Sequence, residues 1–299
     1  MTRVEVVGLD GTPRIVDHDH EPDVFWALRG GGGEFGVVTG VELRLHALPT
    51  VSAGTLFFPM SRAGEVLHAW RRWTRTVSNH TMSCGRLLQY PPLPELPGPL
   101  RGQTFAAVEV AHQGGLAELN GAIAPLRDLA PELDTIAEIP TAGLFALHMD
   151  PPGPTPARAN GMLLNDLPPA AIDALIACAG YGSGSPLVSV ELRQLGGAVA
   201  KRPVNAGAVG HLEAGFLMFA LGVTPDAATA AKVDAHVQVV EQALLPWAAS
   251  IHYANFDERP GGGRNRFHDR PTLERLRAVK RQVDPTGVFT GAHPLTNPP

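Results

Sequence analysis

The chain has 299 residues, enough to bury one large core or two medium ones. Its hydrophobic content of 44% and charged content of 18% are those of an ordinary globular protein, and the formal charge of −5 argues against nucleic acid as the main partner. No stretch is long and apolar enough to predict a membrane span. Cys84 and Cys178 lack metal-ligand spacing, and no secretory signal is recognisable, so we expect a reduced, cytoplasmic setting without a bound metal.

The first 46 residues predict a hairpin, a short helix and a strand. Residues 3–9 and 13–17 are strand-like and flank Asp10-Gly11, a hairpin turn signal. A helix over 22–28 runs into four glycines, 30–33, and a strand over 36–45 follows at once. Glycines reach positive φ cheaply and let the main chain approach a ligand without an intervening Cβ. This segment can therefore lay main chain against a flat or charged group, or form a turn that binds nothing.

The glycine run also contains the spacing G-x-G-x-x-G, at Gly31, Gly33 and Gly36. A Rossmann dinucleotide site carries this motif after a strand and at the start of a helix. Here the order is reversed, because the motif follows a helix and opens a strand. We therefore reject the Rossmann interpretation.

Strands and amphipathic helices alternate from residue 50 to residue 244. Strands paired in sequence and interleaved with helices predict an α+β layer, an antiparallel sheet covered on one face. Residues 148–160 are rich in proline and predict a loop. Strands are expected at 54–59, 82–89, 104–111, 187–195 and 213–222; helices are expected after Ser61 (stripe Val66, Trp70, Trp73, Val77), near Leu116–Leu126, at 169–179 and after Thr224-Pro225 (stripe Val233, Val237, Val240, Leu244).

The strand at 187–195 places Glu191 and Arg193 on the same face, with apolar residues on the other. Two interpretations fit this pattern. The charged pair can be an ordinary ion pair on a solvated sheet face, or it can line a site. His211 is expected to begin the next strand.

The last 49 residues predict a helix with Leu273, Leu276, Val279 and Val283 on one face. The helix stops at Asp284-Pro285, because proline cannot continue it.

Both ends of the chain resemble one family. The helix, glycine run and strand of 22–46 resemble the end of the FAD-binding domain in FAD-linked oxidoreductases of the berberine-bridge-enzyme-like type, within the vanillyl-alcohol-oxidase and p-cresol-methylhydroxylase superfamily. The family's C-terminal segment is resembled by Tyr253-Ala254-Asn255-Phe256, the Asp284–Phe289 turn and His293-Pro294-Leu295. This resemblance implies a strand at 251–256, Ile-His-Tyr-Ala-Asn-Phe. The glycine-rich pyrophosphate loop and the flavin-linking histidine of the family have no match, which implies that the N-terminal part of the FAD domain is lacking.

The resemblance implies an α+β fold, with the C-terminal part of a p-cresol-methylhydroxylase-type FAD-binding domain and an antiparallel-sheet substrate domain covered by helices. It divides the chain into a remnant of the FAD domain (1–48), the substrate domain (49–250) and a segment that returns to the FAD domain (251–299). It also implies site residues: Tyr253, Glu191, Arg193 and His211 for catalysis, and Gly31, Gly32, Gly33, Phe35, Gly36, Val37, Val38 and Asn255 for the cofactor.

The implied activity is that of an FAD-dependent oxidase. It would oxidise a C–H bond next to O or N of a small molecule, with hydride passing to flavin N5 and a base near Tyr253 or Glu191 taking the proton. Molecular oxygen would reoxidise the flavin. The alternative is a truncated, non-catalytic fragment that binds flavin weakly or not at all and exposes an apolar patch.

Overall fold

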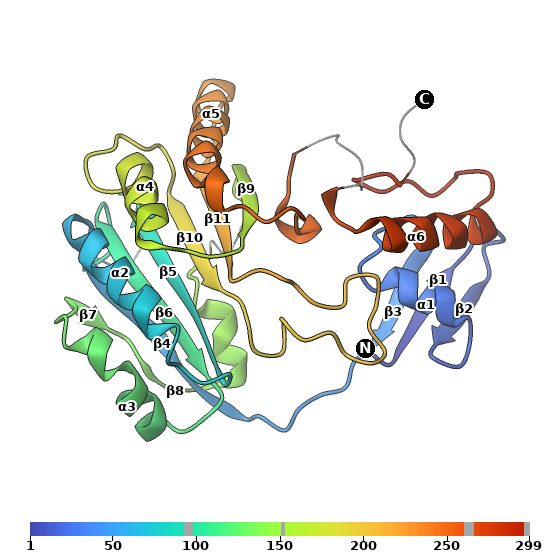
Figure 1. Cartoon of the computed structure of the whole chain (residues 1–299), viewed down its shortest axis with the longest axis horizontal. Helices are drawn as coiled ribbons and strands as arrows, with labels where there is room; N and C mark the ends of the chain where they lie inside the picture. The colour runs from blue at the N-terminus through green and yellow to red at the C-terminus, as the bar shows by residue number, and fades with distance from the viewer. Residues whose placement is uncertain (93–97, 151–152, 260–265, 296–299) are drawn as a thin grey trace.

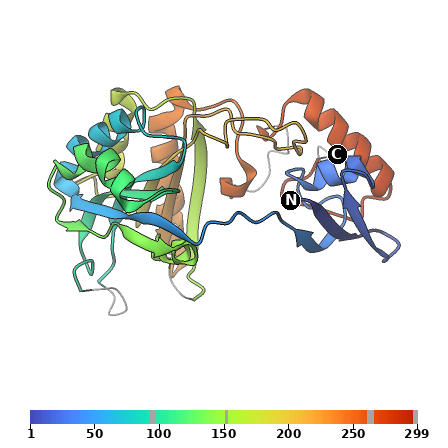
Figure 2. The ribbon, with the colours of Figure 1, turned by 90° about the horizontal axis from the view of Figure 1, so that it is seen from below.

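The chain folds into a small lobe and a large lobe that extended segments join (Figure 1). The computed structural model describes residues 1–92, 98–150, 153–259 and 266–295. The small lobe contains the first three strands and the first and last helices, and the large lobe contains the middle of the chain (Figure 2).

The small lobe is a three-stranded antiparallel sheet with two helices on one face. The strand order is β2 (Pro13–Asp17), β1 (Arg3–Val7), β3 (Val37–Glu42), and the helices are α1 (Pro22–Leu28) and α6 (Arg270–Val283). The predicted hairpin and the helix at 22–28 are confirmed, whereas the strand predicted at 36–45 is shorter. The core joins the two ends of the sequence: Val4, Val6, Val16, Phe25, Trp26 and Phe35 pack with Leu273, Leu276, Val279 and Leu295.

Strand β3 is an apolar edge strand. In the described part of the chain it pairs only with β1. Its valines are 45–57% exposed, and Leu43 and Leu45 after it are 54% and 86% exposed. An exposed apolar edge is a template for pairing with another strand. The exposed residues are Val37, Val38, Val41, Leu43 and Leu45.

The large lobe is an antiparallel sheet of eight strands in the described residues, with helices over one face (Figure 1). The order is β7-β4-β6-β5-β10-β11-β9, and β8 also pairs with β4. This confirms the predicted α+β layer. The strands are β4 (Thr50–Pro59), β5 (Thr81–Gln89), β6 (Thr104–His112), β7 (Leu133–Asp134), β8 (Ala137–Pro140), β9 (Ala157–Leu164), β10 (Ser189–Gln194) and β11 (Phe216–Val223); the helices are α2 (Ala63–Trp73), α3 (Leu116–Arg127), α4 (Pro169–Ala179) and α5 (Ala227–Leu244).

Helix α2 packs its predicted stripe onto the sheet. Trp70 is fully buried, and its indole N–H donates to Ser83 Oγ at 3.0 Å. Gly85 makes room for it, because a Cβ there would lie 2.9 Å from the Trp70 ring. The predicted start of this helix is wrong, since Ser61 lies in the 3₁₀ turn Met60–Arg62 and makes no side-chain cap. Val77 lies beyond the end of the helix and packs, partly buried, against the same core.

Two other local predictions are wrong. Helix α5 begins after Asp226 and not after Thr224, because the Asp226 carboxylate accepts the amide hydrogen of Thr229 at 2.8 Å and Pro225 stays outside. The loop predicted at 148–160 ends in strand β9, whose pairing with β11 over eight residues outweighs the local signal of the prolines before it. Residues 151–152 of that loop lie outside the described residues.

The loop between β10 and β11 crosses from the large lobe to the small one (Figure 1). The Ala208 amide donates to Trp26 O at 3.1 Å, and the Val209 amide donates to Arg29 O at 3.2 Å. The contact is close, since a Cβ on Gly30 would lie 2.6 Å from Val209 N. Glycine is therefore required at this position for the lobes to meet.

Asp284 ends helix α6 and forms the turn that follows. Its carboxylate accepts the amide hydrogens of Val288 at 2.9 Å and Phe289 at 2.8 Å and pairs with Lys280. Burial raises the pKa of Asp284, but the hydrogen bonds from Lys280 and the two amides outweigh it and lower the pKa from 3.8 to about 2. The Asp284 carboxylate thus stabilises the turn that Asp284–Phe289 forms after the helix.

A depressed pKa makes the stability given by Asp284 dependent on pH. This contribution is present above pH 3.8, the unfolded value, and is lost as the pH falls through about 2. We expect Asp284→Asn to lower the melting temperature at pH 7, and the difference from the wild type to shrink between pH 4 and pH 2. Thermal unfolding of both proteins across this range tests it; a difference that does not change with pH would contradict the assignment.

Candidate functional site

The sheet face opposite the helices carries a row of buried charges on β6, β5 and β10. Arg86 donates from Nη1 to Glu109 Oε2 at 3.1 Å and from Nη2 to Glu191 Oε1 at 3.0 Å. The three side chains are only 6–7% exposed. Glu191 therefore belongs to a buried network, and the interpretation of a solvated sheet face is wrong. We call Arg86, Glu109, Glu191 and Arg193 the charge ladder.

Arg193 is the most exposed of these four side chains. It donates to Glu191 Oε2 from Nε at 2.9 Å, and it is 31% exposed. Burial raises the pKa of Glu191, but Arg86 and then Arg193 outweigh it, and the pKa is lowered. Glu191 is therefore held ionised and orients Arg193 toward the open end of the ladder. At the other end, His148 Nδ1 lies 3.0 Å from Glu109 Oε2.

The strand predicted at 251–256 is wrong, because Ala254–Phe256 forms a 3₁₀ turn, η4, which begins after Tyr253. The Phe256 amide donates to Tyr253 O at 3.0 Å and closes the turn. The Asn255 Nδ2 donates to Tyr253 Oη at 3.1 Å. Tyr253 and Asn255 thus hold one another on the outside of the turn, which we call the aromatic turn (Tyr253–Phe256).

Phe256 joins the aromatic turn to the charge ladder. The Arg193 guanidinium lies 5.1 Å from the centre of its ring, and the Phe219 ring meets it edge-on at 5.1 Å. Gly161 makes this approach possible, because a Cβ there would lie 2.7 Å from Phe256 Cβ. The structure therefore brings Glu191 and Arg193 to the aromatic turn.

His211 lies elsewhere. It does not begin a strand, since β11 starts at Phe216, and it belongs to the loop that crosses to the small lobe. Its Nε2 is 2.8 Å from Glu213 Oε1, so its side-chain partner belongs to the loop and not to the charge ladder. Hydrogen bonding to the neighbouring segments starts at Gly215, four residues after His211, where the Gly215 amide donates to Leu164 O at 3.0 Å.

The residues of the glycine run differ in their surroundings. A Cβ on Gly31 would lie 2.3 Å from Ala27 O, and one on Gly36 would lie 2.6 Å from Val6 Cγ2. Packing alone requires glycine at both positions. Gly32 and Gly33 are exposed, and a Cβ on Gly33 would touch nothing within 4 Å. Gly33 is therefore the glycine beside which a ligand has room, whereas the Phe35 side chain is buried in the small core and Val37 and Val38 are exposed.

A buried carboxylate ties the glycine run to the near-terminal segment. Glu34 is 3% exposed, and its two oxygens lie 3.2 Å from the Leu295 amide nitrogen. Two residues earlier, His293 Nε2 lies 3.2 Å from Asp257 O, directly after the aromatic turn. Residues 293–295 thus connect the two segments whose sequences carry the resemblance.

Sequence reasoning missed Arg86, Glu109 and His148. Glu109 lies between two valines and Arg86 is followed by two leucines, and a charge beside apolar residues in a strand is a signal of a buried polar pair. His148 lies in a loop without any pattern. Among the residues described, no helix is long and apolar enough to cross a membrane, and no group of His, Cys, Asp or Glu side chains has an arrangement that fits a metal ion.

Known proteins are similar to this chain, some over a short segment and one over nearly its whole length. It is 24% identical over 321 residues to the xylooligosaccharide oxidase of Thermothelomyces thermophilus, covering 97% of this chain and 61% of that protein. It is 49% identical over 75 residues to the FAD-linked oxidoreductase easE of Aspergillus fumigatus, covering 25% of this chain and 11% of that protein. No family model matches the chain.

Solved structures show the same fold. The BBE-like 1 protein of Physcomitrella patens superposes with a TM-score of 0.82 at 17% identity, covering 100% of this chain and 66% of that structure. A chitooligosaccharide oxidase superposes with a TM-score of 0.79 at 18% identity and the same coverage. The chain thus spans less than two thirds of the length of these proteins. The relatives and the shared fold confirm the resemblance carried by the two ends of the sequence: this chain is a homologue of the FAD-linked oxidoreductases and has the fold of the berberine bridge enzyme-like proteins.

Proposed function

We propose that the chain is part of an FAD-dependent oxidase that removes hydrogen from a C–H bond next to O or N of a small molecule, with molecular oxygen as the electron acceptor. The observation that carries the proposal is the contact between the charge ladder and the aromatic turn through Phe256. It brings polar groups able to bind and deprotonate a substrate to one place. In this proposal residues 1–48 and 251–299 serve the FAD side, and residues 49–250 form the substrate side.

The residues at the glycine run fit a flavin nucleotide. Gly33 is exposed with open space around its Cβ position, so the main chain can meet a flat ring. The exposed amide of Asn255 can hydrogen-bond to ring nitrogens and carbonyls. FAD, when bound, supplies the acceptor for the hydride that leaves the substrate carbon.

On the substrate side, the chain's own residues divide the work. Tyr253 can position the substrate and take its proton, because its hydroxyl is already oriented by Asn255. Glu191 stays ionised and holds Arg193 over Phe256. The guanidinium of Arg193 then presents hydrogen-bond donors to the substrate.

Cys84 and Cys178 are both free, which fits a reducing, cytoplasmic setting.

A second candidate is a non-catalytic chain that binds flavin weakly or not at all. The observation that favours it is the apolar edge of β3, whose valines are 45–57% exposed. In that case, the charge ladder and the aromatic turn would be present without a cofactor held beside them.

An absorption spectrum before and after addition of FAD separates the two candidates. We expect flavin absorption to remain with the protein through gel filtration if this chain holds the cofactor. Bovine serum albumin treated in the same way controls for nonspecific carry-over. A protein that stays colourless after incubation with FAD would refute the oxidase proposal for this chain and leave the non-catalytic candidate.

A further inference from the structure

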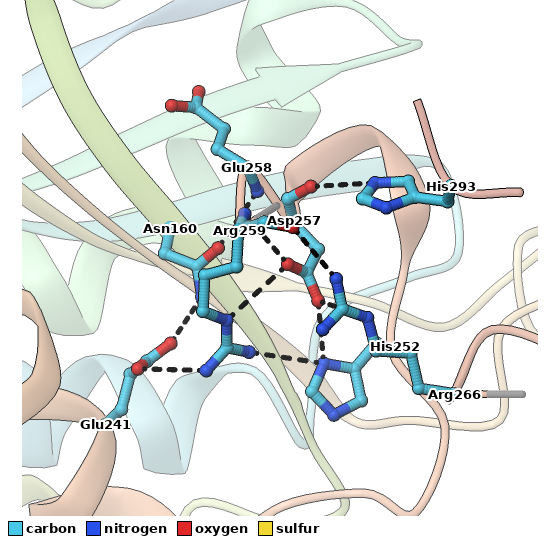
Figure 3. Close-up of polar contacts among 8 residues, drawn as sticks. All are labelled: Asn160, Glu241, His252, Asp257, Glu258, Arg259, Arg266 and His293. Carbon is cyan, nitrogen blue, oxygen red and sulfur yellow. Dashed lines mark hydrogen bonds and ion pairs between the residues drawn. The ribbon is translucent and has the colours of Figure 1, made fainter. Parts of the chain in front are cut away.

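A buried cluster of charges lies directly behind the aromatic turn (Figure 3). Its centre is the carboxylate of Asp257, whose side chain is 0% exposed. Side chains from β9, α5 and the C-terminal segment converge on it. We call this group the Asp257 cluster: Asn160, Glu241, His252, Asp257, Arg259 and Arg266.

Three cationic or hydrogen-donating side chains surround Asp257. His252 Nδ1 lies 3.0 Å from Oδ2, Arg266 Nε lies 3.3 Å from Oδ2, and Arg259 Nε lies 3.5 Å from Oδ1. The backbone amide of Arg259 also donates to Oδ1, at 3.2 Å. A buried carboxylate is costly unless it is paired, and both oxygens of Asp257 have cationic or hydrogen-donating neighbours.

The cluster anchors this centre to the large lobe. Glu241, also buried, pairs with Arg259 Nη1 at 3.2 Å and accepts a hydrogen bond from Asn160. The Oδ1 of Asn160 accepts the amide hydrogen of Glu258 at 3.0 Å. The backbone just after the aromatic turn is thereby fixed to β9 and α5.

His252 and Asp257 are the residues that flank the aromatic turn on its two sides. Their side-chain contact therefore closes a loop around Tyr253–Phe256, which we call the clasp. The ends of the loop are held again by the backbone, because the His252 amide donates to Arg266 O at 2.7 Å and the Asp257 carbonyl oxygen meets His293 Nε2 at 3.2 Å. The clasp fixes the turn that carries Tyr253 and Asn255.

Stability alone does not explain this arrangement. Taking the carboxylates of Asp257 and Glu241 out of water is costly, and well-packed apolar side chains often stabilise a fold as well or better. The ion pairs also fix the orientation of the side chains that flank the aromatic turn. A fixed direction is what Tyr253 needs, since an error of about 1 Å in a catalytic group can lower a rate a hundredfold.

We propose that Asp257 is a positioning residue, which acts through His252 to hold Tyr253 and Asn255 in the geometry that the substrate meets. This rests on the proposed function for its catalytic consequence, but not for its structural one. The clasp itself exists whether or not the chain binds flavin, and it can be tested in the chain as it is.

The first test is hydrogen–deuterium exchange of the full chain, read at the Phe256 amide, which the turn protects. We expect exchange about tenfold faster in Asp257→Asn and in His252→Phe. His252→Asn keeps a donor close to the position of Nδ1 and should restore slow exchange. His68→Phe is the matched control, because it removes a histidine–aspartate contact of the large lobe, His68 Nε2 to Asp173 Oδ1 at 2.8 Å, that does not flank the turn, and there the Phe256 amide should exchange as in the wild type.

If Asp257→Asn does not fold, His252→Phe and His252→Asn decide the question, since both leave the ion pairs of Asp257 with the two arginines in place. Slow exchange at Phe256 in His252→Phe would overturn the proposal. If the wild type oxidises a substrate, kcat should fall about tenfold or more in His252→Phe with KM little changed, and recover in His252→Asn. A wild type that binds no FAD would refute the proposed function, and the exchange measurement would still decide the clasp.

Discussion

Replacing Arg86 with methionine is expected to lower the free energy of unfolding by about 3–5 kcal/mol, because the change removes the buried guanidinium that pairs with two buried carboxylates at once. Glu109 and Glu191 are each about one-fifteenth exposed and both pair with this one guanidinium. Methionine keeps most of the side-chain volume, so the loss reports the charges and not a cavity. Urea unfolding at pH 7 measures it.

Arg193→Met is the matched control for this prediction. Arg193 pairs with Glu191 on the same sheet face, but it is 31% exposed, and Glu191 keeps Arg86 when it is removed. We expect a loss of about 1 kcal/mol or less. An equal loss of unfolding free energy in the two variants would contradict the prediction that the buried Arg86 contributes more to stability than Arg193. A triple variant in which Glu109 and Glu191 are also changed to Gln should recover part of the Arg86→Met loss.

The parts of the fold that depend on local signals could be predicted from the sequence. Helix α4 occupies 169–179 as expected, and strands β5 and β6 lie within one residue of the predicted ranges. Runs of apolar residues at helical or strand spacing are sufficient for such elements. The errors fall where a longer-range contact outweighs a local one: β9 is held by β11, and the 3₁₀ turn after Tyr253 is held by the Asp257 cluster.

The charge ladder could not be predicted for a different reason. Arg86, Glu109 and Glu191 become neighbours only because β5 lies between β6 and β10, and this order joins segments that are more than a hundred residues apart. Glu191 and Arg193 could be placed on one face from their spacing, but whether that face was buried depended on the pairing. The sequence thus predicted Glu191 and Arg193 as candidate residues, but not the ion pair that Glu191 forms with Arg86 of the neighbouring strand.

Alanine substitutions at Gly31 and Gly33 are expected to have large and different effects. The first tests the role of the glycine run in packing, and the second tests its role in binding FAD. Gly31→Ala should lower the free energy of unfolding by about 1–3 kcal/mol or more, because the new Cβ would lie 2.3 Å from Ala27 O and 2.6 Å from Leu276 Cδ2. The carbonyl belongs to helix α1 and cannot move without disturbing it. Chemical denaturation without added FAD measures this loss.

Gly33→Ala should leave that free energy within about 0.5 kcal/mol of the wild type, because the added methyl group meets no atom within 4 Å. If a flavin ring lies against this stretch of main chain, the same methyl group must separate the two, and affinity for FAD should fall about tenfold or more. Titration of FAD against the wild type and Gly33→Ala, followed by flavin fluorescence, provides the comparison. Equal affinities would place the cofactor away from Gly33 and leave the glycine run with a packing role, whereas a loss of affinity without a loss of stability would assign it to the ligand.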